Sequence, residues 1–144
     1  MKDHEPIMTE EQDLAEQIRN ARFIWIAGNG GSASTAEHFA TDLVKKGKRA
    51  IALSSNTSVI TMIAYDYGYA NIFSKLLEAF ASPEDLLITI SCSGSSMNIV
   101  NALNMQERKG FAVYQFETFK PGDRDYAKLE DKHLAFAHRV SGLL

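Results

Sequence analysis

The sequence predicts an α/β fold: a three-layer, doubly wound parallel sheet of four or five strands with helices on both faces. Four short apolar runs are nearly continuous rather than alternating, as expected for strands that are covered on both sides. These runs lie at 23–27, 50–53, 86–90 and 111–116. Segments with helical periodicity separate them, and parallel neighbours need such crossover helices. A length of 144 residues fits one domain, 1–144, with a single core.

The helices are predicted from their start and stop signals, taken in chain order. Within an N-terminal helical segment, 1–20, Thr9 is followed three residues later by Gln12, which is the pattern of a capping box. A second helix should begin near Ser32 and end before Gly47. The remaining predictions are two helices within 56–80, broken around 66–68, one at 97–109 stopped by Gly110, and a last one from about 126.

Composition and charge exclude several classes of protein. A net charge of -3, with 45% hydrophobic and 23% charged residues, is ordinary for a globular protein and leaves no basic stripe for nucleic acid. The one cysteine, Cys92, allows no disulfide framework and favours a reducing compartment. The N-terminus has no apolar signal region, and no apolar run approaches the ~20 residues that span a bilayer. We therefore expect a soluble, cytoplasmic protein with no membrane partner.

Two loops that follow predicted strands have the composition of phosphate-binding loops. The first, 28–32, reads Gly-Asn-Gly-Gly-Ser, and its glycines let the backbone approach a ligand closely. The second, 91–96, reads Ser-Cys-Ser-Gly-Ser-Ser and places four hydroxyls before a helix. Each precedes a helix N-terminus, whose free N–H groups and dipole favour an anion. Because ligands bind at the carboxyl ends of parallel strands, the two loops together predict an anion site.

A nicotinamide-dependent oxidoreductase is the main competing interpretation of the first loop. Gly28-x-Gly30-x-x-Ala33 matches the looser form of the dinucleotide-binding fingerprint. That fingerprint also needs an acidic residue at the end of the next strand, where this chain has Ser54 and Ser55. No Gly-Lys-Ser/Thr follows either glycine run, so a nucleotide-binding Walker loop is absent as well. A phosphorylated small molecule fits the sequence better than a dinucleotide.

Ionisable residues on two predicted helices could supply chemistry beside these loops. His38 and Asp42 are four apart, so they share one helix face just beyond the first loop. The last helix adds two carboxylates and two imidazoles, namely Glu130, Asp131, His133 and His138. Together they could bind zinc with a position open for substrate, or act as a metal-free acid/base pair. Spacing alone does not choose between Glu130 and Asp131, or between His133 and His138.

Several of these motifs, in order along the chain, resemble the SIS (sugar isomerase) domain family and within it the phosphoheptose isomerases. The similarity covers about 21–138, nearly the whole sequence. It is carried by Gly28-Asn29-Gly30-Gly31-Ser32-Ala33-Ser34, His38-Phe39-Ala40-Thr41-Asp42-Leu43, Tyr65-Asp66-Tyr67-Gly68, Ile72-Phe73-Ser74, Ser91-x-Ser93-Gly94-x-Ser96, and Tyr126-Ala127 followed by His133 and His138. The family fold is flavodoxin-like, in agreement with the sheet predicted above.

The resemblance implies an activity and a set of roles. The family's isomerases convert sedoheptulose 7-phosphate into D-glycero-D-manno-heptose 7-phosphate, a precursor of cell-surface lipopolysaccharide, by proton transfer through an enediol. By resemblance, Asp42 is the base and His138 the acid. Substrate-binding positions are Asn29, Gly30, Gly31, Ser32, Asp66 and Glu130, with Ser91, Cys92, Ser93 and Ser96 holding the phosphate. The zinc ligands implied are His38, Asp42, Glu130 and His138. The resemblance thus favours Glu130 over Asp131 and His138 over His133, a choice that spacing alone left open.

The chain departs from the family pattern at positions that matter for chemistry. The family's base is usually Glu, so Asp42 is one methylene shorter, and the usual Gln is replaced by Glu130. The stretch 115–125 also stands where relatives have a longer segment with a further strand. Two hypotheses therefore remain open, an isomerase and a non-catalytic phosphosugar-binding module such as those that bind a replication initiator. The resemblance further implies a homo-oligomer, a tetramer before a dimer.

Overall fold

The computed structural model describes residues 7–144, so the first six residues of the predicted N-terminal segment lie outside the described part. The first half contains α1 (Glu10–Asn20), β1 (Ile24–Gly28), α2 (Gly31–Lys45), β2 (Ala50–Ala52), α3 (Thr57–Tyr67) and a 3₁₀ turn, η1 (Tyr69–Asn71). The second half contains α4 (Ile72–Phe80), β3 (Leu86–Ile90), α5 (Met97–Asn104), α6 (Gln106–Lys109), β4 (Ala112–Gln115) and α7 (Tyr126–Ser141). No helix of this described part is long and apolar enough to cross a membrane.

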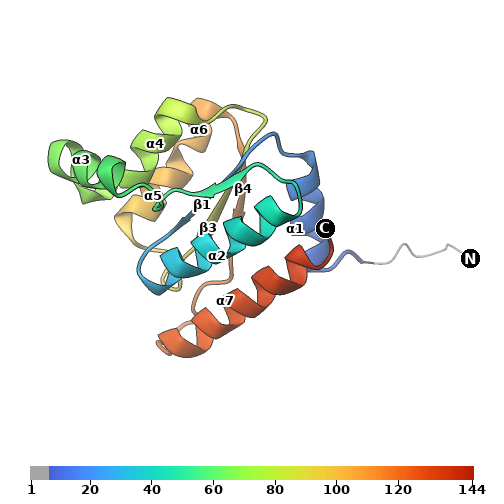
Figure 1. Ribbon diagram of the computed structural model, residues 1–144. Coiled ribbons are helices and arrows are strands. Elements are labelled where there is room, and N and C mark those ends of the chain that lie inside the picture. The colour runs from blue at the N-terminus through green and yellow to red at the C-terminus, as the bar shows by residue number, and fades with distance from the viewer. Residues whose placement is uncertain (1–6) are drawn as a thin grey trace, which may run out of the picture.

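The four strands form one parallel sheet in the order β2-β1-β3-β4, which confirms the predicted fold class. Helices α1, α2 and α7 cover one face of this sheet, and α3 to α6 cover the other (Figure 1). Each link between parallel strands passes through at least one helix, because a parallel neighbour can be reached only by a crossover. The sequence predicted four or five strands, and the sheet of the described residues has four.

Burial on both faces explains why the strands read as continuous apolar runs. In β1, Ile24 and Ile26 belong to the core under α1, α2 and α7, whereas Trp25 and Ala27 belong to the core under α3, α4 and α5. Successive side chains of a strand point to opposite faces, so a strand covered twice needs apolar residues at every position. All five residues of β1 and of β3 are accordingly buried.

The predicted helix 97–109 is divided into two in the structure. The buried side chain of Met105 lies at the junction of α5 and α6, and its N–H donates to the carbonyl of Ala102, three residues back. This 3₁₀-type bond tightens the turn and ends α5 before α6 begins. The strand boundaries differ from the predicted ones by at most one residue, which is within the usual uncertainty at element ends.

A buried carboxylate joins the segments at the amino ends of β1 and β3. Asp85, only 1% exposed, accepts hydrogen bonds from Arg22 Nε and Nη2 at 2.9 and 3.0 Å. It also accepts from Trp25 Nε1 and from the backbone N–H of Ser82, both at 2.9 Å. Four donors therefore compensate the desolvation of one charge at the end of the sheet opposite to the two polar loops.

Replacing Asp85 by Ala should destabilise the protein by about 3–5 kcal/mol, because removing one partner of a buried charged network leaves the others unsatisfied. Urea unfolding of the wild type and Asp85→Ala variant measures this difference. The control is Asp131→Ala, since Asp131 is exposed on α7 and should change the free energy of unfolding by only about 0.5 kcal/mol. Similar effects of the two substitutions would show that Asp85 does not hold these segments together.

Candidate active site

The two polar loops leave the sheet side by side. β1 and β3 are paired along their whole length, with Gly28 opposite Ile90, so the segments that follow them start at the same edge. One segment leads into α2 and the other into α5, and neither helix has a side chain hydrogen-bonded to its first turn as a cap. At the start of α2 the N–H groups of Ser32 and Ala33 already donate to the carbonyls of Asn29 and Gly30, so the start of α5 offers an anion more free N–H groups.

A small cavity of about 140 Å³ lies between these loops and the start of α7. Its lining is Asn29, Gly31, Ser32, Ile90, Ser91, Cys92, Ser93, Ser96, Tyr126 and Glu130. Eight of the predicted substrate-binding residues therefore come together here. Gly30 instead precedes α2 with a φ of 55°, a left-handed conformation that favours glycine. Asp66 is exposed on α3 and does not line this cavity.

Glycine at position 31 makes room for the carboxylate of Glu130. A Cβ at position 31 would overlap Glu130 Oε2, so the Glu130 carboxylate can occupy this place only while position 31 has no side chain. Gly28 is constrained in the same way from within the loop, since a Cβ there would lie 2.5 Å from the Ser32 carbonyl oxygen. The glycine-rich segment thus serves close packing as well as ligand approach.

The carboxylate of Glu130 also affects the one thiol of the site. Burial raises the pKa of Cys92, and the negative charge of Glu130 raises it further, while a hydrogen bond involving Ser32 opposes both effects. A higher pKa means less thiolate at neutral pH, and the thiolate is the reactive form. Cys92, 4% exposed, is therefore a buried lining residue whose environment favours the thiol over the thiolate.

The sequence analysis missed a polar residue that joins the two loops. Asn98, at the start of α5 and 2% exposed, exchanges two hydrogen bonds with Asn29. Asn29 Nδ2 donates to Asn98 Oδ1 at 2.8 Å, and Asn98 Nδ2 donates to Asn29 Oδ1 at 2.9 Å. The hydroxyl of Tyr69 also donates to Asn29 Oδ1, at 3.3 Å. An asparagine in a first helical turn resembles an ordinary cap, so only its tertiary partner reveals its role.

A second group of donors lies further along α2, where α2 packs against α7. His138 Nε2 is 3.0 Å from His38 Nε2, and Asp42 Oδ2 is 3.5 Å from His38 Nε2 and 4.0 Å from His138 Nε2. Tetrahedral zinc with bonds of about 2.0–2.1 Å separates its ligand atoms by about 3.3 Å. The three donor atoms therefore fit a zinc ion, with a fourth position left for another ligand.

The structure distinguishes among the ionisable residues of α7 that the sequence left open. His138 joins His38 and Asp42 in the three-residue group, whereas His133 is buried and its Nε2 lies 2.6 Å from the Glu117 carbonyl oxygen. Glu130, implied by resemblance as a fourth ligand, lies outside this group, because its carboxylate is directed to the first loop and Gly31. The described residues thus form a small polar cavity at the two loops and a separate nitrogen–oxygen donor group.

The distance between the two parts suits an elongated substrate. His38 is seven residues beyond Gly31 on α2, which corresponds to about 10 Å along the helix axis. An anionic group held at the loops would therefore place the far end of a chain-like molecule near His38, Asp42 and His138. Imidazole and carboxylate groups at such a position can move protons or hold a metal ion.

Comparisons with known proteins identify the relatives of this chain. Residues 2–116 match the family model of the SIS domain. The phosphoheptose isomerase of Campylobacter concisus is 33% identical over 90% of this chain and 78% of its own length. That of Trichlorobacter lovleyi is 42% identical over 96% of this chain and 81% of its own length. The solved phosphoheptose isomerase of Neisseria gonorrhoeae superimposes with a TM-score of 0.84 at 27% identity, over 92% of this chain and 81% of that one.

Proposed function

The chain belongs to the SIS domain family and is an isomerase, and we propose that it interconverts a ketose phosphate and an aldose phosphate, with sedoheptulose 7-phosphate as the ketose. The product would be D-glycero-D-manno-heptose 7-phosphate. The observation that carries the proposal is the pairing of a serine-rich anion cavity with an imidazole–carboxylate group about 10 Å along the same helix. Among known proteins, the relatives named phosphoheptose isomerase support the same substrate.

The length of the substrate follows from the separation of the two parts of the site. In a heptulose 7-phosphate the phosphate and the reacting carbons C1 and C2 are at opposite ends of the carbon chain. The phosphate would bind Ser91, Ser93 and Ser96 and the first N–H groups of α5. C1 and C2 would then lie beside Asp42 and His138, and Asn29, Ser32 and Glu130 would accept or donate hydrogen bonds to hydroxyls between the two ends.

Asp42 is the proposed base. Its Oδ2 faces both histidines, whereas Oδ1 takes part in no hydrogen bond or ion pair of the described residues. Oδ1 would remove a proton from C1 of the ketose, giving an enediol, and would return that proton to C2. His138, as the acid, would give a proton to the oxygen on C2 as the enediol forms, and would take the proton of the C1 hydroxyl as the enediol becomes the aldehyde. The reaction is thus internally balanced and needs no oxidant or reductant.

Zinc fits the donor group, and as the alternative to this metal-free acid/base pair we propose His38, Asp42 and His138 as its ligands, because His138 Nε2 cannot hold a metal ion and donate a proton at the same time. A bound divalent ion would supply Lewis-acid stabilisation for negative charge on the substrate oxygens. Glu130, placed over the first loop, would then act on the substrate and not on the metal. We also propose a cytoplasmic location, where the lone Cys92 would remain reduced.

The proposed activity is tested by incubating the protein, both metal-free and zinc-loaded, with a panel of five-, six- and seven-carbon ketose phosphates and measuring aldose formation. We expect turnover with sedoheptulose 7-phosphate and less with shorter ketoses, since these reach only one part of the site. Replacing Ser93 and Ser96 by Ala should raise the KM about 10- to 100-fold, because hydrogen bonds to a charged group contribute about 1.5–3 kcal/mol.

Ser95→Ala is the matched control for that pair of substitutions, since Ser95 belongs to the same loop but does not line the cavity. Binding of inorganic phosphate, measured by calorimetry, separates recognition of the anion from chemistry. Unchanged phosphate affinity in the Ser93→Ala, Ser96→Ala double variant would remove the serine loop from the site. No turnover of any ketose phosphate would contradict the proposed reaction.

Elemental analysis after zinc loading should find about one zinc ion per chain in the wild type. His38→Ala and His138→Ala should each lose most of this metal, because two remaining donors rarely hold zinc. Glu130→Gln should retain it, since Glu130 lies outside the three-donor group. Loss of zinc from Glu130→Gln would instead make Glu130 the fourth ligand that the family resemblance implied.

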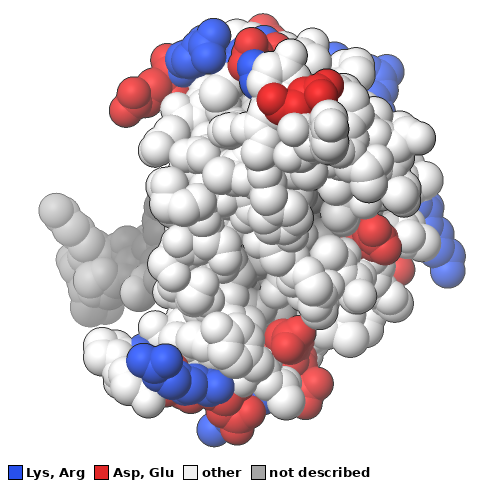
Figure 2. Space-filling model, turned by 90° about the vertical axis from the view of Figure 1, so that its left-hand side faces the viewer, with Lys and Arg blue, Asp and Glu red and all other residues white. Residues whose placement is uncertain are grey.

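We propose further that the chain forms a closed homo-oligomer, a tetramer in preference to a dimer, through the side from which α3 projects. Ile63 is the one buried residue of α3, while Met62, Tyr65 and Tyr67 are 48%, 92% and 53% exposed. Figure 2 shows this side: the broad central surface carries few charges, and Lys, Arg, Asp and Glu gather toward the rim. Exposed apolar patches of this kind normally contact another chain.

Light scattering at micromolar concentration should therefore give a mass of several chains. Tyr65→Glu should lower the average mass, because it places a charge in the centre of the contact surface. Tyr65 is almost fully exposed, so the fold of the single chain should be unaffected, and circular dichroism provides that control. A monomeric wild type with full isomerase activity would overturn the proposed assembly.

A further inference from the structure

The sheet ends at β4 with an unpaired edge. Within the described residues the strand order stops there, and no strand lies beyond β4. The N–H groups of Ala112 and Phe116 donate toward β3, to the carbonyls of Asp85 and Thr89. Because alternate residues of a strand bond to opposite sides, Val113 and Gln115 direct their N–H and C=O groups away from the sheet. Gln115 is exposed, so this edge can be reached from solvent.

The two edges of the sheet differ in how they are protected. β2, at the other edge, follows directly on a basic segment that contains Lys45, Lys46, Lys48 and Arg49. Segment 111–116 around β4, Phe-Ala-Val-Tyr-Gln-Phe, has no charged residue, proline or glycine. Lysine and proline are the residues that prevent pairing of exposed edges, and uncharged six-residue segments rich in β-formers pair readily. The composition therefore indicates that the β4 edge is covered by another strand.

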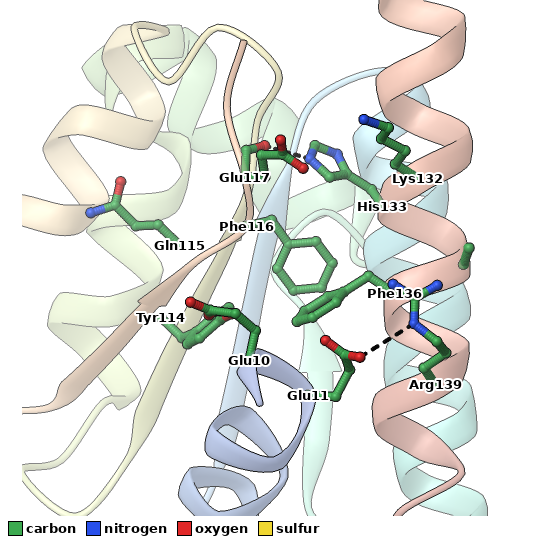
Figure 3. Close-up of a pocket in the computed structure, with 11 residues that line it drawn as sticks. Glu10, Glu11, Tyr114, Gln115, Phe116, Glu117, Lys132, His133, Phe136 and Arg139 are labelled. Atoms are coloured by element: carbon green, nitrogen blue, oxygen red, sulfur yellow. Dashed lines mark hydrogen bonds and ion pairs between the residues drawn. The ribbon is translucent and has the colours of Figure 1, made fainter. Parts of the chain in front are cut away.

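A groove of about 620 Å³ runs beside this edge, between β4, α1 and α7 (Figure 3). It lies apart from the cavity at the serine loops. Its inner wall is aromatic, with Tyr114, Phe116 and Phe136 in mutual contact. Several polar groups at its rim already have partners: Tyr114 O–H donates to Glu10 at 2.6 Å, and Arg139 pairs with Glu11 at 3.5 Å. An occupant thus meets an aromatic wall and a row of backbone groups.

We propose that β4 pairs antiparallel with β4 of a second copy of this chain, joining two four-stranded sheets into one of eight strands. A strand with the same outward groups on both chains is self-complementary, as a two-fold interface requires. If Val113 lies opposite Gln115 of the second copy, then Val113 and Gln115, whose N–H and C=O groups point outward, both find outward-pointing partners on the other chain. If β4 instead pairs with residue 113 opposite residue 113, or with residue 115 opposite residue 115, only one of these two residues finds such a partner within β4.

This arrangement also closes the groove. The two-fold axis passes beside Tyr114 and runs perpendicular to the sheet, so both copies keep their α1 and α7 helices on the same side. Tyr114 belongs to the side of the sheet covered by α1, α2 and α7, which is the side on which the groove opens. Tyr114 of each copy would therefore lie at the mouth of the other's groove and cover its aromatic wall. This contact is separate from the α3 side, and two such two-fold contacts together build a closed tetramer.

Gln115→Lys tests the pairing, because it places two like charges near the two-fold axis without disturbing the bonds from β4 to β3. Sedimentation velocity should show that self-association through this edge weakens at least tenfold, which would reduce a tetramer to dimers or a dimer to monomers. Gln115→Thr, an uncharged β-former, should keep the wild-type mass. Asn104→Lys, on an exposed position of α5 in the opposite layer, is the control for added charge.

Amide hydrogen exchange identifies which surface is paired. The amides of Val113 and Gln115 should exchange slowly in the wild type and at least tenfold faster at position 113 in Gln115→Lys. If the wild type forms only dimers and these two amides exchange slowly, the dimer contact is the β4 edge. This result would support the β4 pairing and would contradict the proposed contact through the α3 side. Rapid exchange of both amides in the wild type, or equal masses of wild type and Gln115→Lys, would overturn the proposal and leave the groove to another occupant.

Discussion

The pairing of β1 with β3 is the constraint on which the site depends. These strands are far apart in the sequence, yet their register from Ile24–Leu86 to Gly28–Ile90 ends both at the same edge. Only this pairing brings the glycine loop and the serine loop together, so that the starts of α2 and α5 point at one small cavity. At the opposite end of the same pair, the four hydrogen bonds to Asp85 join the segments that lead into the strands.

The site also depends on the close packing of α7 on α2. α7 brings Glu130 to the loop and His138 to His38 and Asp42, and the carboxylate of Glu130 fits beside the loop because position 31 has no side chain. The same helix turns its other side to the groove beside β4, through Phe136 and Arg139. One helix thus links the anion cavity, the donor group and the sheet edge, and a change in its position would affect all three.

The position of Glu130 illustrates how charge is distributed in this site. A carboxylate beside a cavity for an anion opposes anion binding, and its effect on the pKa of Cys92 shows that its field reaches the serine loop. The hydroxyls of the serine loop and the backbone N–H groups beside them are donors that would compensate this charge in the proposed phosphate site. A carboxylate can also accept hydrogen bonds from sugar hydroxyls, which would favour a polyhydroxylated ligand over a simple anion.

The sequence alone determined the fold class, the strands and the composition of both loops, because these depend on local hydrophobic period and on residues next to each other in the chain. It also placed His38 and Asp42 on one helix face. It did not choose between His133 and His138, or find Asn98, because those answers depend on which helix packs on which. Position 31 shows the reason most simply: only the tertiary structure places a carboxylate from residue 130 where a side chain would otherwise be.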